Sequence, residues 1–254
     1  MLMCYHVSQD SNAAALKAKY KAQYPLENQH HLFFHANGFA HPELALVCAS
    51  HLNATNLNNA YSLPVHNDSS EMIINRFKWG LIPHWVKDWD TAKKLRIQTL
   101  NAVSETVFEK PSFRDSIMTR RCIIPVTGFF EWKHLEKHKQ PFYIYPADEV
   151  IFNLAGIYSS WKNPSTLEVM NTFSILTKEA SGLMADIHNS KFRQPVFIQN
   201  QHVASWLNPT LSKNGVLELF QDKVEIDAHP ISNLISSKVE DSNIPDVTLP
   251  LNLL

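Results

Sequence analysis

The apolar residues of this chain occur in many short runs rather than in long helical stripes. The runs lie at 44–49, 73–79, 122–126, 142–145, 151–158, 173–177 and 196–199. Short apolar runs rich in β-branched and aromatic residues are typical of strands. The chain has 14 Pro but only 6 Gly, which favours strands joined by stiff turns over a helical bundle. With 254 residues and 44% hydrophobic content, the sequence predicts one β-rich α+β domain spanning residues 1–254.

Short helices are expected around these strands. Asp10 or Ser11 can cap a first helix that runs to about Tyr24, where Pro25 stops it. Further helices are predicted at 104–110, 178–187, 202–207 and 215–221, the last two with amphipathic patterns. The Asn- and Ser-rich stretch at 51–70 predicts a loop. The polar stretch at 236–246 predicts a surface segment that leads into a short apolar tail ending at residue 254.

Charge and cysteine content limit the kinds of partner and compartment. Lys and Arg total 23 against 24 Asp and Glu, so nucleic acid contact requires a local basic patch. No apolar run is long enough to cross a bilayer, and no leader pattern opens the chain, so we expect a soluble, unsecreted protein that makes no membrane contact. Three cysteines, Cys4, Cys48 and Cys122, argue against a disulfide framework or a zinc cluster and favour a reducing cytoplasm.

The sequence MCYH places Cys4 directly after Met3. One interpretation is a small buried residue on a first strand. The other is that translation from Met3 followed by methionine removal leaves Cys4 with a free α-amine. Such an amine has a pKa of about 7.7 to 8.0 and is partly nucleophilic near neutrality. It forms a Schiff base with an aldehyde, and the thiol then closes a stable thiazolidine ring on the same carbon.

Three further motifs contain polar residues that can carry chemistry: LNAVSET at 100–106, GFFEWK at 128–133 and ADIHNSKFRQPVF from Ala185. In a strand, Glu131 points away from the face that Phe130 and Trp132 share. A carboxyl in such surroundings can have a raised pKa and act as an acid or base, or it can be an ordinary edge-strand glutamate in water. His188 can likewise be a hydrogen-bonded structural residue.

Together and in this order, the motifs make the sequence resemble the SOS response-associated peptidase (SRAP) family, whose members process abasic sites in DNA. The resemblance also includes WGLIPHW from Trp79, FSILTKEA from Phe173 and RQP from Arg193. It implies a compact, barrel-like fold with mixed or antiparallel sheets and a groove for single-stranded DNA. It places the family's catalytic residues at Cys4, Asn101, Glu131 and His188, and it implies no cofactor and no metal.

The resemblance and the chemistry together assign these residues roles. Cys4 supplies amine and thiol, Asn101 orients the N-terminal residue, and Glu131 shuttles protons. His188 assists opening of the deoxyribose ring, since only the open sugar offers an aldehyde. The predicted product is a covalent thiazolidine crosslink between protein and DNA, and a lyase side reaction is chemically plausible because a Schiff base acidifies the neighbouring sugar proton. We expect a monomer that acts in the response to DNA damage.

DNA contact is expected from basic residues interleaved with aromatic ones. The candidates are Arg76, Lys78, Lys87, Lys93, Lys94 and Arg96, with Trp79, Trp85 and Trp89. Lys191 and Arg193 near His188, and Thr177 in FSILTKEA, complete the predicted DNA-binding set. The alternative is a solvated charged face beside core tryptophans.

Four features depart from the family pattern. The family commonly has arginines where this chain has His6 and Val103, so two phosphate contacts lack their usual residue. The stretch from His188 to Pro195 is also longer than in the shortest members. With Met1 as the first residue, Leu2 blocks methionine removal. Either Met3 is then the natural start, or the chain removes residues 1–3 itself, as the family's peptidase name suggests.

Two other classes of function remain open. A cysteine peptidase acting in trans would pair the Cys4 thiolate with His188 as base, with Asn101 or Asp186 orienting it. A metal-binding or plain nucleic-acid-binding module would use His30 with His31, or His134 with His138. Surface histidines are the interpretation that the sequence favours for these pairs.

Overall fold

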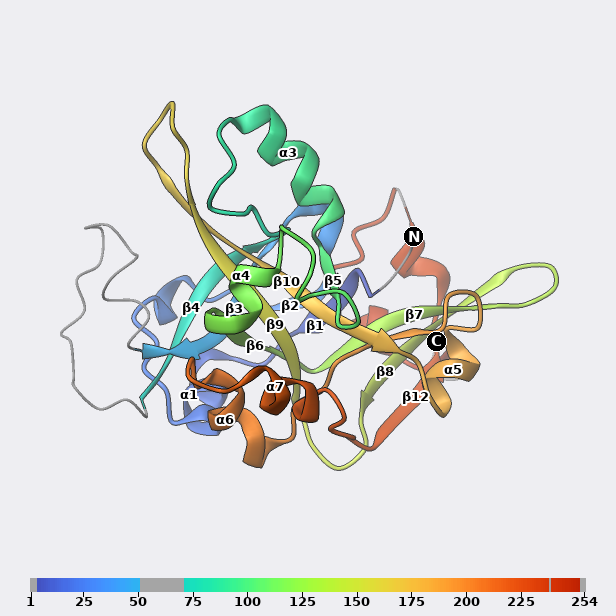
Figure 1. Cartoon of the computed structure of the whole chain (residues 1–254). Helices are drawn as coiled ribbons and strands as arrows, with labels where there is room; N and C mark the ends of the chain where they lie inside the picture. Colours follow the sequence, from blue (N-terminus) through green and yellow to red (C-terminus); the bar gives the residue numbers. More distant parts are fainter. Residues whose placement is uncertain (1–3, 51–70, 238, 252–254) are drawn as a thin grey trace.

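The computed structural model describes residues 4–50, 71–237 and 239–251, and its strands form two sheets with short helices around them (Figure 1). The larger sheet contains β3 (Glu43–Ala49), β4 (Met72–Trp79), β5 (Asn101–Val103), β6 (Arg121–Val126), β9 (Phe152–Lys162), β10 (Val169–Glu179) and β11 (Arg193–Pro195). The smaller sheet has the order β12 (Ile226–Pro230), β8 (Lys139–Pro146), β7 (Gly128–His134), β1 (His6–Gln9) and β2 (Phe33–Asn37). The predicted β-rich α+β class is confirmed.

Five strands of the larger sheet close into a barrel. Following the order β10, β4, β3, β6 and β9, the last strand pairs back with the first. The β4–β10 pair is parallel and the other four pairs are antiparallel, so the barrel is mixed. Two more strands extend β10 beyond the ring, β5 in parallel and β11 antiparallel. Closure leaves each of the five strands with a neighbour on both sides.

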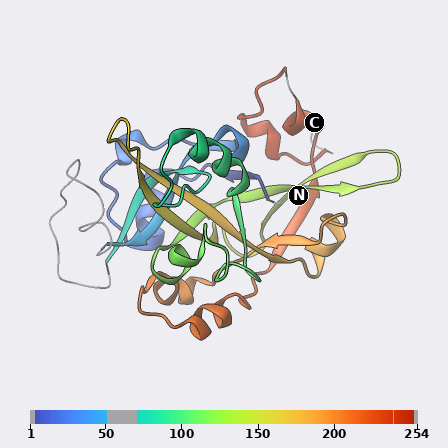
Figure 2. The ribbon, with the colours of Figure 1, turned by 45° about the horizontal axis from the view of Figure 1, so that its top comes forward.

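The smaller sheet holds a long hairpin, β7–β8, that projects from the molecule in both views (Figure 2). The C-terminal segment (red) lies beside the base of this hairpin, where Ile231, Ile235 and Val247 pack in one buried cluster with Phe130. Phe129, next along β7, contacts Phe152 of the barrel. Consecutive residues of β7 therefore pack in different cores, because successive side chains of a strand point to opposite faces of the sheet.

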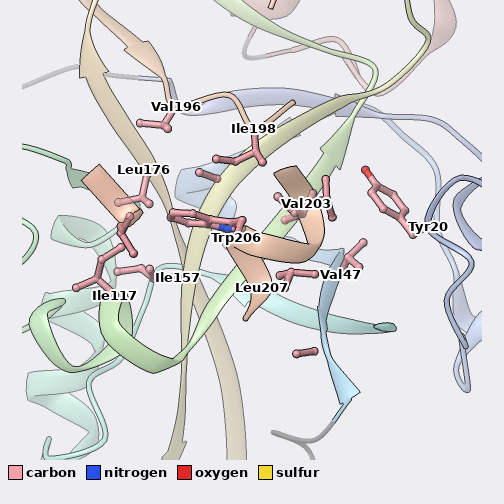
Figure 3. Close-up of a cluster of buried hydrophobic side chains, with 14 of the residues drawn as sticks. Tyr20, Val47, Ile117, Ile157, Leu176, Val196, Ile198, Val203, Trp206 and Leu207 are labelled. Carbon is pink, nitrogen blue, oxygen red and sulfur yellow. The ribbon is translucent and has the colours of Figure 1, made fainter. Parts of the chain in front are cut away.

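Short helices pack around the two sheets. These are α1 (Ala13–Tyr20), α3 (Trp89–Gln98), α4 (Arg114–Thr119), α5 (Leu183–Ile187), α6 (Val203–Leu207) and α7 (Lys213–Leu219). Trp206 of α6 packs among Ile117, Ile157 and Leu176, so it joins α4 and α6 to the barrel wall (Figure 3). Its indole N–H donates to the Cys122 carbonyl at 2.8 Å. Burying one such aromatic ring contributes on the order of 2–3 kcal/mol.

Several predicted elements have different bounds. The first helix begins at Ala13, since the Asn12 side chain rather than Asp10 or Ser11 caps it, and it ends before Lys21, which is left-handed with φ 49°. Residues 104–110 form successive turns and no helix. The stretch 178–187 is divided, because its first two residues complete β10 and α5 begins only at Leu183.

The run at 196–199 is not a strand; β11 precedes it at Arg193–Pro195, and Phe197 makes a single bridge to Leu154. The helices expected at 202–207 and 215–221 correspond to α6 and α7. The predicted loop at 51–70 lies outside the described residues. In the part of the chain that the structure describes, no helix has the length and apolar character needed to cross a bilayer.

Candidate functional site

Cys4 lies two residues before the start of β1 and is 1% exposed. The Asn101 side chain donates from Nδ2 to the Cys4 carbonyl at 3.1 Å. Asn101 begins β5, which is fixed by parallel pairing of Asn101 with Ile175 of β10. The barrel thus positions the amide that holds the backbone of Cys4. The Oδ1 atom of Asn101 is buried without a hydrogen-bond partner, so the side chain keeps one acceptor free beside Cys4.

Glu131 is a buried carboxyl in β7. It is 5% exposed, and its Oε1 atom has no hydrogen-bond partner. Burial raises the pKa of Glu131 to about 8, although the Trp132 backbone N–H opposes the shift. The carboxyl therefore carries its proton at neutral pH and titrates just above it.

His188 follows α5 and faces this carboxyl. Its Nδ1 lies 3.8 Å from Oε1 of Glu131 and 2.8 Å from the Arg193 carbonyl. Because a carbonyl only accepts, the bond to Arg193 requires the hydrogen on Nδ1 and leaves Nε2 with its lone pair. Burial lowers the pKa of His188, so the neutral form with Nε2 as a base is favoured.

Asn189 is a positioning residue that the sequence did not single out, although it ends the motif ADIHN. Its Oδ1 accepts from the His134 backbone N–H and its Nδ2 donates to the His134 carbonyl, both at 3.0 Å. This reciprocal pair ties the turn containing His188 to the end of β7. Glu131 and His188 are therefore held by a direct link between their two elements.

A cavity of about 260 Å³ opens over Glu131 and His188, and Cys4 lies buried outside its lining. Its walls include Tyr5, Glu131, Trp132, His188 and Lys191. Trp132 is half-buried and Lys191 is exposed, so the cavity combines an apolar wall with a cation at the rim. Such a volume suits a small polar group such as an opened sugar carrying an aldehyde.

The thiol of Cys4 is held in its protonated form. Burial raises its pKa well above the ordinary value and the charge of Glu131 raises it further, while the His6 backbone N–H lowers it. Nδ1 of His188 donates to the Arg193 carbonyl rather than to this thiol. Residues 1–3, which decide whether Cys4 has a free amine, lie outside the described residues.

Two predicted DNA-binding residues are corrected. Trp79 is fully buried, stacks on Phe173 and donates its indole N–H to the Leu100 carbonyl at 2.8 Å. Thr177 is also fully buried, in β10. Neither side chain reaches the surface. Trp79 packs in an apolar core of the barrel, and WGLIPHW therefore contributes a core tryptophan rather than a stacking platform.

The other basic and aromatic candidates lie in different environments. Lys78, Lys87, Lys93 and Lys94 are exposed, and Trp85 is 45% exposed with its indole N–H 3.4 Å from the Pro111 carbonyl. Arg76 pairs with Glu43 at 2.8 Å, Arg96 is buried, and the half-buried Trp89 stacks on Trp161. Lys93 pairs with Asp90 at 2.9 Å, whereas Lys78, Lys87, Lys94 and Trp85 are exposed to an approaching nucleic acid strand.

Lys191 and Arg193 differ in their charge balance. Lys191 is exposed at the cavity rim. Arg193 makes a two-pronged ion pair with Glu105, at 2.6 and 2.8 Å, and donates to the Thr177 carbonyl at 2.8 Å. Glu105 largely neutralises Arg193, which leaves Lys191 as the less compensated cation of the two.

The histidine pairs considered as metal ligands do not form a cluster. His30 bonds through Nδ1 to the Tyr24 hydroxyl and through Nε2 to the Ser11 carbonyl, so both ring nitrogens are engaged. Across residues 4–50, 71–237 and 239–251, no three His, Cys, Asp or Glu side chains gather as metal ligands would.

Comparison with known proteins places this chain in a family. The family model described as SOS response associated peptidase (SRAP) matches residues 3–238. The abasic site processing protein YoqW of Bacillus subtilis is 36% identical over 184 residues, covering 71% of this chain and 79% of its own. The abasic site processing protein HMCES of Gallus gallus is 28% identical over 207 residues, covering 73% of this chain and 60% of its own.

Solved structures agree with the fold. A protein from Bacteroides thetaiotaomicron superposes with a TM-score of 0.84 at 34% identity, covering 97% of this chain and 99% of its own. A protein from Bordetella bronchiseptica has a TM-score of 0.72 at 18% identity, over 90% of this chain and all of its own, and supports the fold alone. With the family model matching nearly its whole length, the chain belongs to the SOS response-associated peptidase (SRAP) family.

Proposed function

We propose that this protein captures the aldehyde of an abasic site in single-stranded DNA and joins it to Cys4 as a thiazolidine. The names of its relatives, abasic site processing proteins, support the substrate class. The observation that supports the proposal best is the arrangement at Cys4. Asn101 donates to its carbonyl, and the buried Glu131, protonated at neutral pH, is near enough to influence its thiol electrostatically. Capture requires a free α-amine at Cys4, and hence a mature chain that begins at this residue.

The chemistry follows from these groups. The Cys4 amine adds to the aldehyde carbon, and the carbinolamine hydroxyl leaves as water after Glu131 donates a proton to it. The resulting iminium carbon is then attacked by the Cys4 sulfur, whose proton returns to the Glu131 carboxylate. The amine nitrogen keeps its remaining hydrogen. Glu131 therefore ends the sequence protonated, as it began, and its pKa near 8 suits transfer in both directions.

His188 suits the step that precedes capture, because an abasic sugar is mostly a closed hemiacetal. The neutral Nε2 of His188 can accept the proton of the anomeric hydroxyl and deliver it to the ring oxygen as the ring C–O bond breaks, which gives the open aldehyde and returns His188 to its neutral form. Its orientation is fixed from the other side by the Arg193 carbonyl on Nδ1. Single-stranded DNA would be held by Lys78, Trp85, Lys191 and Arg193, with Arg76 contributing if Glu43 releases it.

The direct test uses protein shown by intact mass to begin at Cys4, incubated with an oligonucleotide carrying one abasic site. Mass spectrometry should find an adduct lighter by one water than the two components together. Cys4→Ala should abolish it, and Cys4→Ser should give at most a reversible, borohydride-trappable imine. Glu131→Gln and His188→Ala should slow it by about 100-fold or more. Cys48→Ala, which keeps Cys4, is the matched control. No adduct with wild-type protein would overturn the proposal.

The start of the chain needs its own experiment. We propose that residues 1–3 are removed, either because Met3 initiates translation or through self-cleavage. The intact mass of the untagged, natively expressed protein should match a chain beginning at Cys4. A purified full-length chain that shortens without added enzyme, but not as Glu131→Gln, would support self-cleavage. A stable adduct on protein that keeps Met1 would contradict the thiazolidine.

Peptide hydrolysis in trans is the alternative, and it requires a Cys4 thiolate with His188 as its base. Burial keeps the Cys4 thiol protonated, and Nδ1 of His188 donates to the Arg193 carbonyl, which leaves only Nε2 to act as a base. These features favour chemistry that begins at the amine over chemistry that begins at a thiolate. Lyase activity, by contrast, shares the imine with the proposed route, and strand cleavage by the slow Cys4→Ser variant would reveal it.

A further inference from the structure

A chain of hydrogen bonds between side chains leads away from the site cavity. His6, which lines the cavity, bonds through Nδ1 to Nε2 of His35 at 2.7 Å. His35 bonds through Nδ1 to the Ser242 hydroxyl at 2.6 Å. The three residues come from β1, β2 and the C-terminal segment. His35 is 8% exposed whereas Ser242 is half-buried, so the chain runs from the cavity through the interior toward solvent.

The surrounding structure holds this chain in place. The His6 ring meets Trp132 edge-on with centroids 4.9 Å apart, and His35 meets Phe130 edge-on at 5.4 Å. Next to Ser242, Asn243 accepts through Oδ1 from the backbone N–H groups of Phe34 and His35, at 2.8 and 3.2 Å. The C-terminal segment is therefore docked on β2 by bonds of its own, which aim the Ser242 hydroxyl at His35.

Both imidazoles are neutral. Burial, and then the neighbouring His35, lowers the pKa of His6 to about 3. Burial lowers the pKa of His35 to about 4, although Asp241 opposes this shift. The other titratable groups at the cavity are Glu131, His134, Lys139, His188 and Lys191. With Glu131 protonated and the lysines at the rim, no fixed negative charge in the cavity draws a proton onto His6.

Two neutral imidazoles joined nitrogen to nitrogen share one hydrogen, so the chain has two tautomeric states. In one, Nδ1 of His6 and Nδ1 of His35 donate, and Nε2 of His6 has its lone pair. In the other state, the Ser242 hydroxyl donates to Nδ1 of His35 and Nε2 of His35 donates to Nδ1 of His6. Nε2 of His6 then carries a proton. The change takes a proton onto Nε2 and releases one from the Ser242 hydroxyl to water, and neither ring becomes charged at the beginning or the end.

The proposed function needs such a path. An α-ammonium group loses one proton before it can add to an aldehyde, and at pH 7 about five in six or more of such groups are protonated. Glu131, already protonated and 5% exposed, cannot accept that proton. Once DNA covers the cavity, direct exchange with solvent is restricted. A path leading away from the cavity, on the side of β2, avoids this obstacle.

We propose that His6, His35 and Ser242 form a proton relay that connects the reaction cavity with solvent and carries away the proton of the Cys4 ammonium. This proposal rests on the proposed function. His6 contacts the cavity, whereas His35 and Ser242 act through it and are positioning residues for the transfer.

Rapid-mixing measurements of adduct formation test the relay. Ser242→Ala keeps both imidazoles but removes the hydroxyl that releases the proton to solvent. His35→Gln keeps a side chain that can form hydrogen bonds but cannot pass a proton from His6 to Ser242. Each should slow adduct formation on the order of tenfold or more, with oligonucleotide affinity unchanged. Ser242→Thr should restore the rate. Millimolar imidazole should accelerate the two slow variants but not wild type, a rescue that a purely structural defect would not show. Ser165→Ala, at an exposed position in the turn between β9 and β10, is the matched control.

Nitrogen NMR of the labelled protein separates the relay from the capture reaction. His6 and His35 should both report neutral rings at pH 7, with scalar coupling across their N–H···N bond, and Ser242→Ala should change the tautomer balance of His35. A charged ring, or no coupling, would overturn the relay whether or not DNA is captured. Wild-type rates in both slow variants would overturn it while leaving capture intact. Absence of any wild-type adduct would overturn the proposed function, and with it the role of the relay.

Discussion

At the scale of single residues, Glu131 shows how much of the site a strand pattern can predict. Alternation along β7 separates Glu131 from Phe130 and Trp132, and this could be read from GFFEWK alone. What the pattern could not give is the depth of burial, which depends on Cys4 and His188 from distant parts of the chain. The same limit explains Trp79, because an aromatic residue beside lysines in sequence can still pack inward.

The buried Glu131 carboxyl should make stability depend on pH. Its pKa is about 8 in the folded chain and near 4.3 when unfolded, so between these values the folded state binds more protons. Stability should fall as pH rises through this window, by up to ~1.4 kcal/mol per pH unit. Glu131→Gln should remove that loss and be the more stable protein at pH 9. Urea unfolding at pH 5, 7 and 9 measures this; parallel curves for both proteins would contradict it.

At the scale of elements, the short helices depend on side chains that reach across to strands. Arg121, at the start of β6 and 1% exposed, donates to the carbonyls of Ile117, Met118 and Trp206, and to that of Asn208. It joins the ends of α4 and α6 to the barrel. Such links explain why helix bounds were poorly predicted, since tertiary bonds rather than local propensity decide where these short helices end.

Replacing Arg121 by Met should leave these carbonyls without donors while retaining much of the side-chain volume. The expected loss is about 3 kcal/mol or more of unfolding free energy, because several buried acceptors become unsatisfied. Chemical denaturation followed by tryptophan fluorescence measures it. Arg114→Met, at an exposed position in α4, should change stability by less than about 0.5 kcal/mol. Equal effects of the two substitutions would refute this role of Arg121.

Asn189 should matter to reaction geometry more than to folding. Asn189→Ala removes both bonds to His134, so the turn bearing His188 loses its link to β7. We expect an unfolding cost of about 1–2 kcal/mol and adduct formation slowed several-fold, with DNA affinity unchanged. Asn163→Ala, which removes a bond in the exposed β9–β10 turn, should leave the rate unaltered. A rate effect no larger than that of this control would argue against the link.

At the scale of the whole molecule, charge is balanced overall and unequal locally. The formal net charge is −1, yet exposed lysines accompany Trp85, and Lys191 stands at the cavity rim. The composition excluded a protein that is basic overall, but it could not show which Lys and Arg side chains form ion pairs with carboxylates. Arg76 and Arg193 looked equivalent to the lysines in sequence, and only the folded chain reveals their ion pairs with Glu43 and Glu105.

Salt dependence distinguishes these cations. Each phosphate contact to single-stranded DNA contributes about −0.7 to the slope of log affinity against log salt concentration. Lys191→Ala should therefore make the slope shallower by about 0.7, as measured by fluorescence anisotropy between low and moderate salt. Lys17→Ala, on α1 and paired with Glu27, should leave it unchanged. Identical slopes for wild type and Lys191→Ala would remove this lysine from the DNA-binding surface.

The pairing of β10 has a consequence for how such a protein can change over evolution. Asn101 reaches Cys4 from β5, and Arg193, whose carbonyl orients His188, begins β11. Both strands pair with residues 175–179 of β10. The spacing between Asn101 and Arg193 is therefore set by the pairing register of a single strand. Turns elsewhere, such as 163–168, can lengthen or shorten without altering the reactive spacing, whereas a one-residue insertion within 175–179 would displace Asn101 and Arg193 relative to each other.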